Sequence, residues 1–146
     1  MSTLSHLLFP SGPHSRELSL LLLALRLLLG GLLLVHGLDK WLHFSALETT
    51  FPDPIGVGSR FSLMLCIFAE VFCASLVIIG LFSRLALIPI LINMAVALLV
   101  IHRGTPFMAR ELSFIYLIIF LILMITGPGL YSFDSLISHH LLRPKG

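Results

Sequence analysis

The sequence predicts an all-α membrane protein, an antiparallel bundle of four transmembrane helices. Of its 146 residues, 58% are hydrophobic and only 11% are charged, and the mean hydropathy is +1.07. Soluble domains carry about 25% charged residues, and so little charge does not cover so much apolar surface in water. Four apolar runs of about 16–22 residues approach the roughly 20 that a helix needs to cross a membrane. Short polar connections favour antiparallel neighbours.

The expected membrane domain covers residues 18–130, between an N-terminal tail (1–17) and a C-terminal tail (131–146). Its four spans are expected at about 18–38, 61–82, 85–102 and 111–127. The first run is too long for the hydrophobic region of a signal peptide and no small-residue cleavage site follows it, so it is interpreted as a retained span. After the fourth span a short helix is expected, with Asp134 as its own N-terminal cap.

Charge and cysteine content exclude several classes of function. The net charge is +2 and no run of Lys or Arg exceeds two residues, so nucleic-acid binding is not indicated and the lipid bilayer is the expected partner. Cys66 and Cys73 lie seven residues apart in one run. That spacing puts their Cα atoms about 10 Å apart, too far for a disulfide. Both are therefore interpreted as small buried hydrophobic residues.

Two ionisable residues lie deep inside the spans. Charges in a hydrocarbon core cost about 2.5–3.5 kcal/mol each, so they are retained when paired or used. Arg26 lies eight residues into the first span, and Glu70 lies twelve residues from the end of the second span on the same side of the membrane. Their depths then differ by about 6 Å, which predicts an ion pair that Asn93 of the third span could join. The pair would either only fix helix packing or form a charged floor under a polar ligand or a proton relay.

A second polar cluster is expected where four helix ends meet at the opposite membrane face. Its members are His36, Lys40, His43, Arg60, His102, Arg103, Arg110 and Glu111. Gly30, Gly31 and Gly37 would permit close approach by a helix or a flat ligand. These side chains could extend to the head groups, bind a metal, or pass protons and polarise the carbonyl oxygens of a quinone. No spacing matches a metal, flavin or haem motif, so no metal site is assigned.

Several short motifs follow one another along the four spans. The first matching motifs are Arg26 followed by Leu-Leu-Leu-Gly-Gly, then His36-Gly37-x-x-Lys40, Phe51-Pro52 and Glu70. Later motifs are Gly80-Leu81-Phe82-Ser83-Arg84, Ala95 or Ala97 with the His102 region, Glu111 with Tyr116, Gly127-Pro128-Gly129 and Asp134. In these motifs and their order the chain resembles the DoxX family of small bacterial membrane proteins, over roughly residues 26–134. The resemblance implies a four-span protein of the bacterial cytoplasmic membrane, with relatives that resemble quinone-reducing subunits or membrane partners of redox-defence proteins.

Three functions are compatible with these residues. The first is a quinone-binding subunit that works with a partner oxidoreductase. In it, His36, Glu70, His102 and Glu111 would act as catalytic acid–base groups, and Arg26, Lys40 and Asn93 would bind the cofactor. The second is a non-catalytic scaffold or anchor that docks a partner through residues 41–60. The third is a small-solute transporter, which would require a homo-oligomer to form a path. A cavity open to lipid beside Glu70 or His102 would favour the first of these.

Overall fold

The computed structural model describes residues 15–142, with side chains up to His140, so residues 1–14 and 143–146 of the expected tails lie outside it. Four helices are long and apolar enough to cross a membrane, which confirms the predicted fold class. The first is α2 (Arg16–Leu42), the second joins α4 (Ser59–Ile67), η1 (Phe68–Cys73) and α5 (Ala74–Ile79), the third joins α6 (Ser83–Val96) and η2 (Ala97–Ile101), and the fourth is α7 (Phe107–Thr126). Two short helices, α3 (Phe44–Leu47) and α8 (Phe133–Leu142), complete the described chain.

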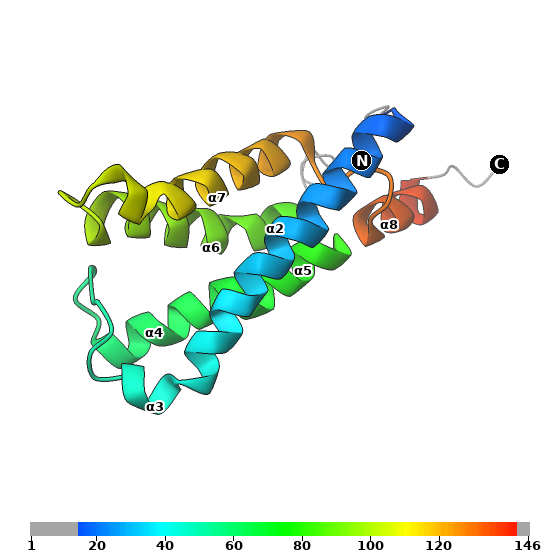
Figure 1. Ribbon diagram of the computed structural model, residues 1–146. Coiled ribbons are helices and arrows are strands. Elements are labelled where there is room, and N and C mark those ends of the chain that lie inside the picture. The colour runs from blue at the N-terminus through cyan, green and yellow to red at the C-terminus, as the bar shows by residue number, and fades with distance from the viewer. Residues whose placement is uncertain (1–14, 143–146) are drawn as a thin grey trace.

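The four long helices form two pairs. Helix α2 packs along α4, η1 and α5, and α6 packs against α7. Helix α6 also contacts η1 and α5, which joins the two pairs. Toward the left of Figure 1, α4 and α6 diverge, and the loop of residues 48–58 rises beside the space between them. The buried core therefore lies where the pairs meet, and most side chains in each long helix face outward, toward lipid.

Both helices that border this space contain a π-helical stretch. Residues 68–73 form η1 and residues 97–101 form η2. A π turn carries one extra residue per turn and is frequent at functional sites because it re-aims side chains. Glu70 lies inside η1, and the backbone N–H of His102 donates to the carbonyl of Ala97, which ends η2. Each wide turn therefore positions an ionisable residue that the sequence selected as a candidate.

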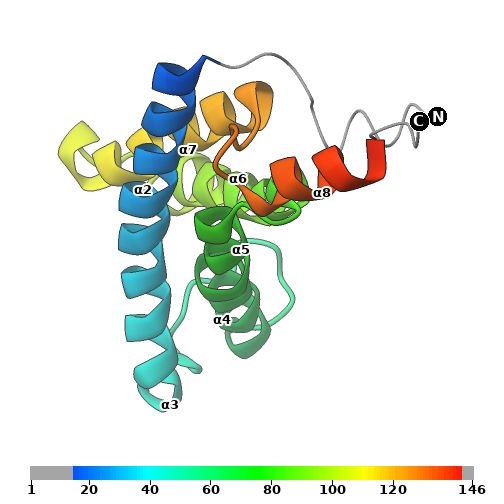
Figure 2. The same ribbon diagram turned by 90° about the vertical axis from the view of Figure 1, so that its right-hand side faces the viewer.

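Asp134 does not cap its own helix, which corrects the prediction made from sequence. Its carboxylate accepts hydrogen bonds from the backbone N–H groups of Phe82 (2.7 Å) and Ser83 (2.9 Å) at the start of α6. Its own N–H donates to the carbonyl of Gly80 at 2.8 Å. Free N–H groups at a helix start require acceptors, and here a residue more than 50 positions away in the sequence supplies them. Helix α8 is thereby fixed to the α5–α6 turn, lying crosswise to α2 in Figure 2.

Arg26 is almost fully buried, with 2% of its surface exposed. Its guanidinium donates to four backbone carbonyls at distances of 2.7 to 3.0 Å, those of Val77, Ile78, Pro128 and Tyr131. The nearby negative charge that acts on it belongs to Asp134. The predicted Arg26–Glu70 ion pair is therefore wrong, and Arg26 instead joins α2 to the end of α5 and to the loop before α8.

Helix register explains the error. Glu70 lies opposite Gly37 of α2, whereas Arg26 lies opposite Val77 and Ile78. Eleven residues of helix separate position 26 from position 37, which is about 16 Å. Helix α2 extends beyond the end of α5, so counting inward from the two apolar run ends does not give equal depths.

The loop between α3 and α4 is held by Asp53. Its carboxylate accepts hydrogen bonds from the Ser62 hydroxyl (2.8 Å) and from the backbone N–H groups of Gly58 (2.7 Å) and Val57 (3.0 Å). These bonds, the one from Ser62 foremost, lower the pKa of Asp53 below its ordinary value. Because they favour the ionised form, the carboxylate stays charged at neutral pH and keeps this loop folded against α4.

Candidate functional site

A cavity of about 590 Å³ lies between α2, α4, η1, α6, η2 and α7, with the 48–58 loop at its edge. Sites for small molecules typically measure about 300–1,000 Å³ and are lined mainly by apolar groups with a few placed polar ones. Most of its wall is apolar, including Leu33, Ile92 and Ile101. Leu65 and Ile92, both on the wall, are 42% and 59% exposed. The cavity therefore reaches the lipid-facing surface between α4 and α6.

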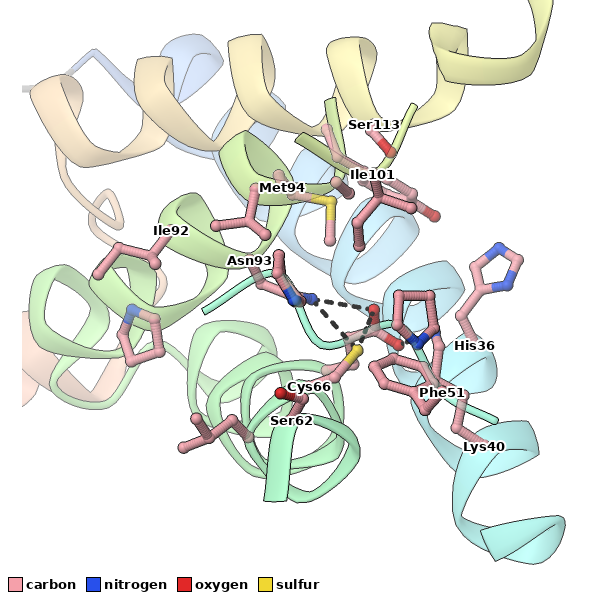
Figure 3. A pocket seen from close by; sticks show the side chains of 18 of the residues that line it. His36, Lys40, Phe51, Ser62, Cys66, Ile92, Asn93, Met94, Ile101 and Ser113 are labelled. Carbon is pink, nitrogen blue, oxygen red and sulfur yellow. Dashed lines mark hydrogen bonds and ion pairs between the residues drawn. The ribbon is translucent and has the colours of Figure 1, made fainter. Parts of the chain in front are cut away.

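Glu70 is the centre of a polar network in the cavity wall. One oxygen, Oε2, pairs with Nζ of Lys40 from α2. The other, Oε1, accepts from Nδ2 of Asn93 at 3.0 Å and from Sγ of Cys66 at 3.3 Å. The Glu70 side chain is only 6% exposed, and Lys40 is 26% exposed. The predicted contact of Asn93 with Glu70 is confirmed, whereas the cation is Lys40 instead of Arg26 (Figure 3).

His36 and His102 line the same cavity. His36 lies one helical turn before Lys40 and is exposed. His102 is half-buried, and its Nδ1 lies 2.7 Å from the carbonyl oxygen of Ala97. Because that oxygen only accepts, Nδ1 carries the proton in the neutral ring, which leaves Nε2 as an acceptor. The structure thus joins members of the two expected clusters in one site.

Two predicted site residues lie elsewhere. Arg26 is engaged at the end of α5, and Glu111 is exposed on α7 and does not line the cavity. Five residues separate Glu111 from Tyr116, about 140° around the helix axis, so only the face of Tyr116 points inward. Within residues 15–140, no three His, Cys, Asp or Glu side chains gather closely enough to hold a metal ion.

Comparison with known proteins decides the family. The family model described as DoxX matches residues 21–103, more than half of the chain. The chain belongs to the DoxX family. The match contains most of α2 and all of α3, α4, η1, α5, α6 and η2. It therefore covers His36, Lys40, Glu70, Asn93 and His102.

A curated relative has a similar length. The "Uncharacterized membrane protein Rv3486" of Mycobacterium tuberculosis is 30% identical over 149 residues, an alignment that covers 90% of this chain and 86% of the relative. No solved structure matches the chain. Together with the four apolar helices, these findings identify a multi-pass membrane protein of the DoxX family.

Sequence reasoning missed two residues of this DoxX cavity. Cys66, interpreted as an inert hydrophobe, donates to Glu70 one helical turn away, whereas Cys73 belongs to the core. Tyr116 lines the cavity from α7, although the sequence singled it out only as part of a family motif. The i, i+4 spacing of Cys66 and Glu70 was the available signal for the first. The three-residue spacing of Ser113 and Tyr116, both wall residues, was the signal for the second.

Close helix approach sets the position of Glu70. A Cβ atom placed on Gly37 would lie 2.7 Å from Cβ of Glu70 and 2.8 Å from its backbone carbon. A Cβ atom placed on Gly31, on the same helix, would meet nothing within 4 Å. The close approach expected at the three glycines therefore occurs at Gly37, and at Gly30 against Ile78, but not at Gly31.

Gly37→Ala and Gly31→Ala are expected to change stability in opposite directions. At Gly37 the added methyl group must push η1 away from α2, which costs about 1–3 kcal/mol. At Gly31 alanine gains about 0.5–1 kcal/mol through its better helix propensity. Thermal unfolding of both variants in the same detergent measures the difference. Equal unfolding temperatures for Gly37→Ala and Gly31→Ala would contradict the register of α2 against η1.

Proposed function

We propose that this DoxX protein binds the head group of a membrane quinone in the cavity and serves as the membrane subunit or partner of a redox enzyme in the bacterial cytoplasmic membrane. The observation that carries the proposal is the Lys40–Glu70–Asn93 network in the wall of an apolar cavity that reaches the lipid-facing surface. A quinone combines a polar ring with a long apolar tail. A cavity open to lipid accommodates the tail in the membrane and the ring beside the polar wall.

The polar residues of the cavity suit both the oxidised and the reduced form of a quinone. A quinone accepts two electrons and two protons when it is reduced. The electrons would come from a partner oxidoreductase, since the residues described here include no group that carries them. Lys40 has three N–H donors, and one goes to Glu70, so two remain for a carbonyl oxygen. The imidazoles of His36 and His102, both in the cavity wall, would hold or pass the two protons of the ring.

The same cavity is the argument for quinone over the competing functions. A scaffold needs no internal cavity, and the residues that contact its partner would lie on the outer loop. The cavity instead concentrates Lys40, Glu70, Asn93 and His102 in its wall. Buried charges are costly in lipid and are expected where they are used. Binding of a lipid-soluble ligand accounts for both the charges and the lateral opening.

Quinone content of the purified protein tests the proposal. The protein is purified in mild detergent, extracted with organic solvent, and the bound quinone is identified by mass spectrometry. The native protein should carry quinone well above the level in protein-free micelles. Glu70→Gln and His36→Ala should reduce the quinone-to-protein ratio several-fold, because the first removes the charge that pairs with Lys40 and the second removes an imidazole from the cavity wall.

Matched controls exist on the same chain. Glu111→Gln and His43→Ala change the same residue types at exposed positions outside the cavity, and both should retain the native quinone content. His36 is exposed, so its variant stays informative if Glu70→Gln unfolds. A native protein with no quinone above background, or the same content in all four variants, would refute the proposal.

A further inference from the structure

Tyr116 places an unpartnered hydroxyl in the cavity region. The residue is 2% exposed and lines the cavity, yet its hydroxyl has no hydrogen-bond partner among the residues that the structure describes. Its ring stacks on Phe120, with centroids 5.7 Å apart and planes 8° apart. Buried polar groups are nearly always hydrogen-bonded, and each exception requires an explanation. At the wall of a binding cavity, the missing partner is expected to be the ligand.

The position of Tyr116 complements the Glu70 network. Tyr116 comes from α7, whereas Lys40 comes from α2 and Asn93 from α6. Its side chain also lies within electrostatic range of the Glu70 carboxylate. The cavity therefore presents hydrogen-bonding groups from more than one wall. Stacking on Phe120 fixes the ring, so the hydroxyl is held in place before any ligand enters.

We infer that Tyr116 is a ligand-binding residue whose hydroxyl donates a hydrogen bond to a carbonyl oxygen of the bound quinone. This inference rests on the proposed function. A quinone ring presents carbonyl oxygens at separate positions and has no donor of its own, so it requires donors from different walls. A phenol both donates and accepts, so Tyr116 can also accept the hydroxyl hydrogen of the reduced ring. The ligand class is then a ring with at least two oxygen acceptors.

Tyr116→Phe is expected to weaken quinone binding without lowering the stability of the protein. The substitution removes one buried oxygen that has no partner among the described residues, so it removes a desolvation cost and keeps the stacking on Phe120. The ligand-free protein should therefore unfold at the same temperature or about 2–5 °C higher. Quinone affinity should fall about three- to tenfold, because the hydrogen bond to the ring is lost. A structural role of the hydroxyl would lower the unfolding temperature instead.

Binding of a short-chain benzoquinone, decylubiquinone, measures the effect. Isothermal titration calorimetry of the purified protein in detergent measures the affinity. Decylbenzene, which keeps the tail and a ring but has no carbonyl oxygen, serves as the second ligand. Tyr116→Phe should weaken decylubiquinone and leave decylbenzene unchanged. The control Tyr131→Phe alters an exposed tyrosine and should bind both as the native protein does.

The outcomes separate the two proposals. If Tyr116→Phe binds decylubiquinone with native affinity, or unfolds at a clearly lower temperature, the role of Tyr116 is refuted and quinone binding stands. If the native protein binds decylubiquinone no better than decylbenzene, quinone binding and the role of Tyr116 are both refuted. Loss of affinity for both ligands in Tyr116→Phe would indicate a reshaped cavity and also refute the hydrogen bond.

Discussion

Replacing Arg26 with alanine is expected to prevent the chain from accumulating as a folded protein. The guanidinium satisfies four backbone carbonyls in two separate segments, the end of α5 and the loop before α8. Hydrogen bonds from a charged donor contribute about 1.5–3 kcal/mol each. The four contributions are not additive, but together their loss should lower the free energy of unfolding by at least about 4 kcal/mol. That is much of the stability of a typical domain. Membrane yield and thermal unfolding in detergent measure the loss.

Two further arginine variants make the result specific. Arg26→Lys keeps the charge but lacks the planar guanidinium that reaches several carbonyls at once, so intermediate stability is expected. Arg60→Ala removes an exposed arginine whose Nε lies 3.5 Å from Oε2 of Glu48. This substitution should lower the free energy of unfolding by less than about 1 kcal/mol. A folded Arg26→Ala protein with the unfolding temperature of Arg60→Ala would contradict the role of Arg26.

Replacing Lys40 with methionine should have the second largest effect. It leaves the Glu70 carboxylate buried without its counter-charge. Breaking a buried ion pair by removing one partner costs about 3–5 kcal/mol. The double variant Lys40→Met/Glu70→Gln removes both charges and should recover a large part of that loss. Unfolding of both single variants and the double variant forms a thermodynamic cycle.

The coupling in that cycle is the informative quantity. Removing each charge alone and then both together should give strongly non-additive effects, with the double variant more stable than Lys40→Met. Additive losses would mean that Lys40 and Glu70 act independently. The Lys40 ammonium group would then extend to the lipid head groups, which is the alternative given above for basic residues near the membrane boundary.

Much of the fold could be predicted because lipid imposes simple rules. A helix must satisfy its own backbone groups in the membrane, so each apolar run became a helix near its expected position. The first helix is longer than expected, residues 16–42 instead of about 18–38. Lys40 therefore belongs to the helix and faces Glu70, where a shorter span would have placed it in a loop.

Pairing across the helices could not be predicted in the same way. Hydrophobic runs determine where helices cross the membrane, but they do not fix the register between two helices. Gly37 sets that register through its contact with Glu70. The pattern of hydrophobic residues does not predict which residue of another helix packs against a glycine. Arg26 and Glu70 were consequently placed at similar depths although about 16 Å of helix separates their levels.

Contacts between distant segments escaped prediction for a related reason. Asp134 is a suitable cap by residue type, and the sequence places it beside its own helix. The N–H groups it satisfies belong to α6, which only the three-dimensional fold brings near. Glu111 was selected because it is acidic and close to a span end, yet helical periodicity places Tyr116 and not Glu111 on the cavity face.

Photolabelling with an azido-substituted short-chain benzoquinone tests the central claim most directly, because mass spectrometry then locates the bound ring on the chain. Labels should fall on cavity residues such as Cys66, Asn93 and Tyr116, and excess decylubiquinone should suppress them. Labels confined to outward-facing side chains such as Ile88 and Ile118, unaffected by competition, would show instead that quinone only touches the outer surface and that the cavity does not bind it.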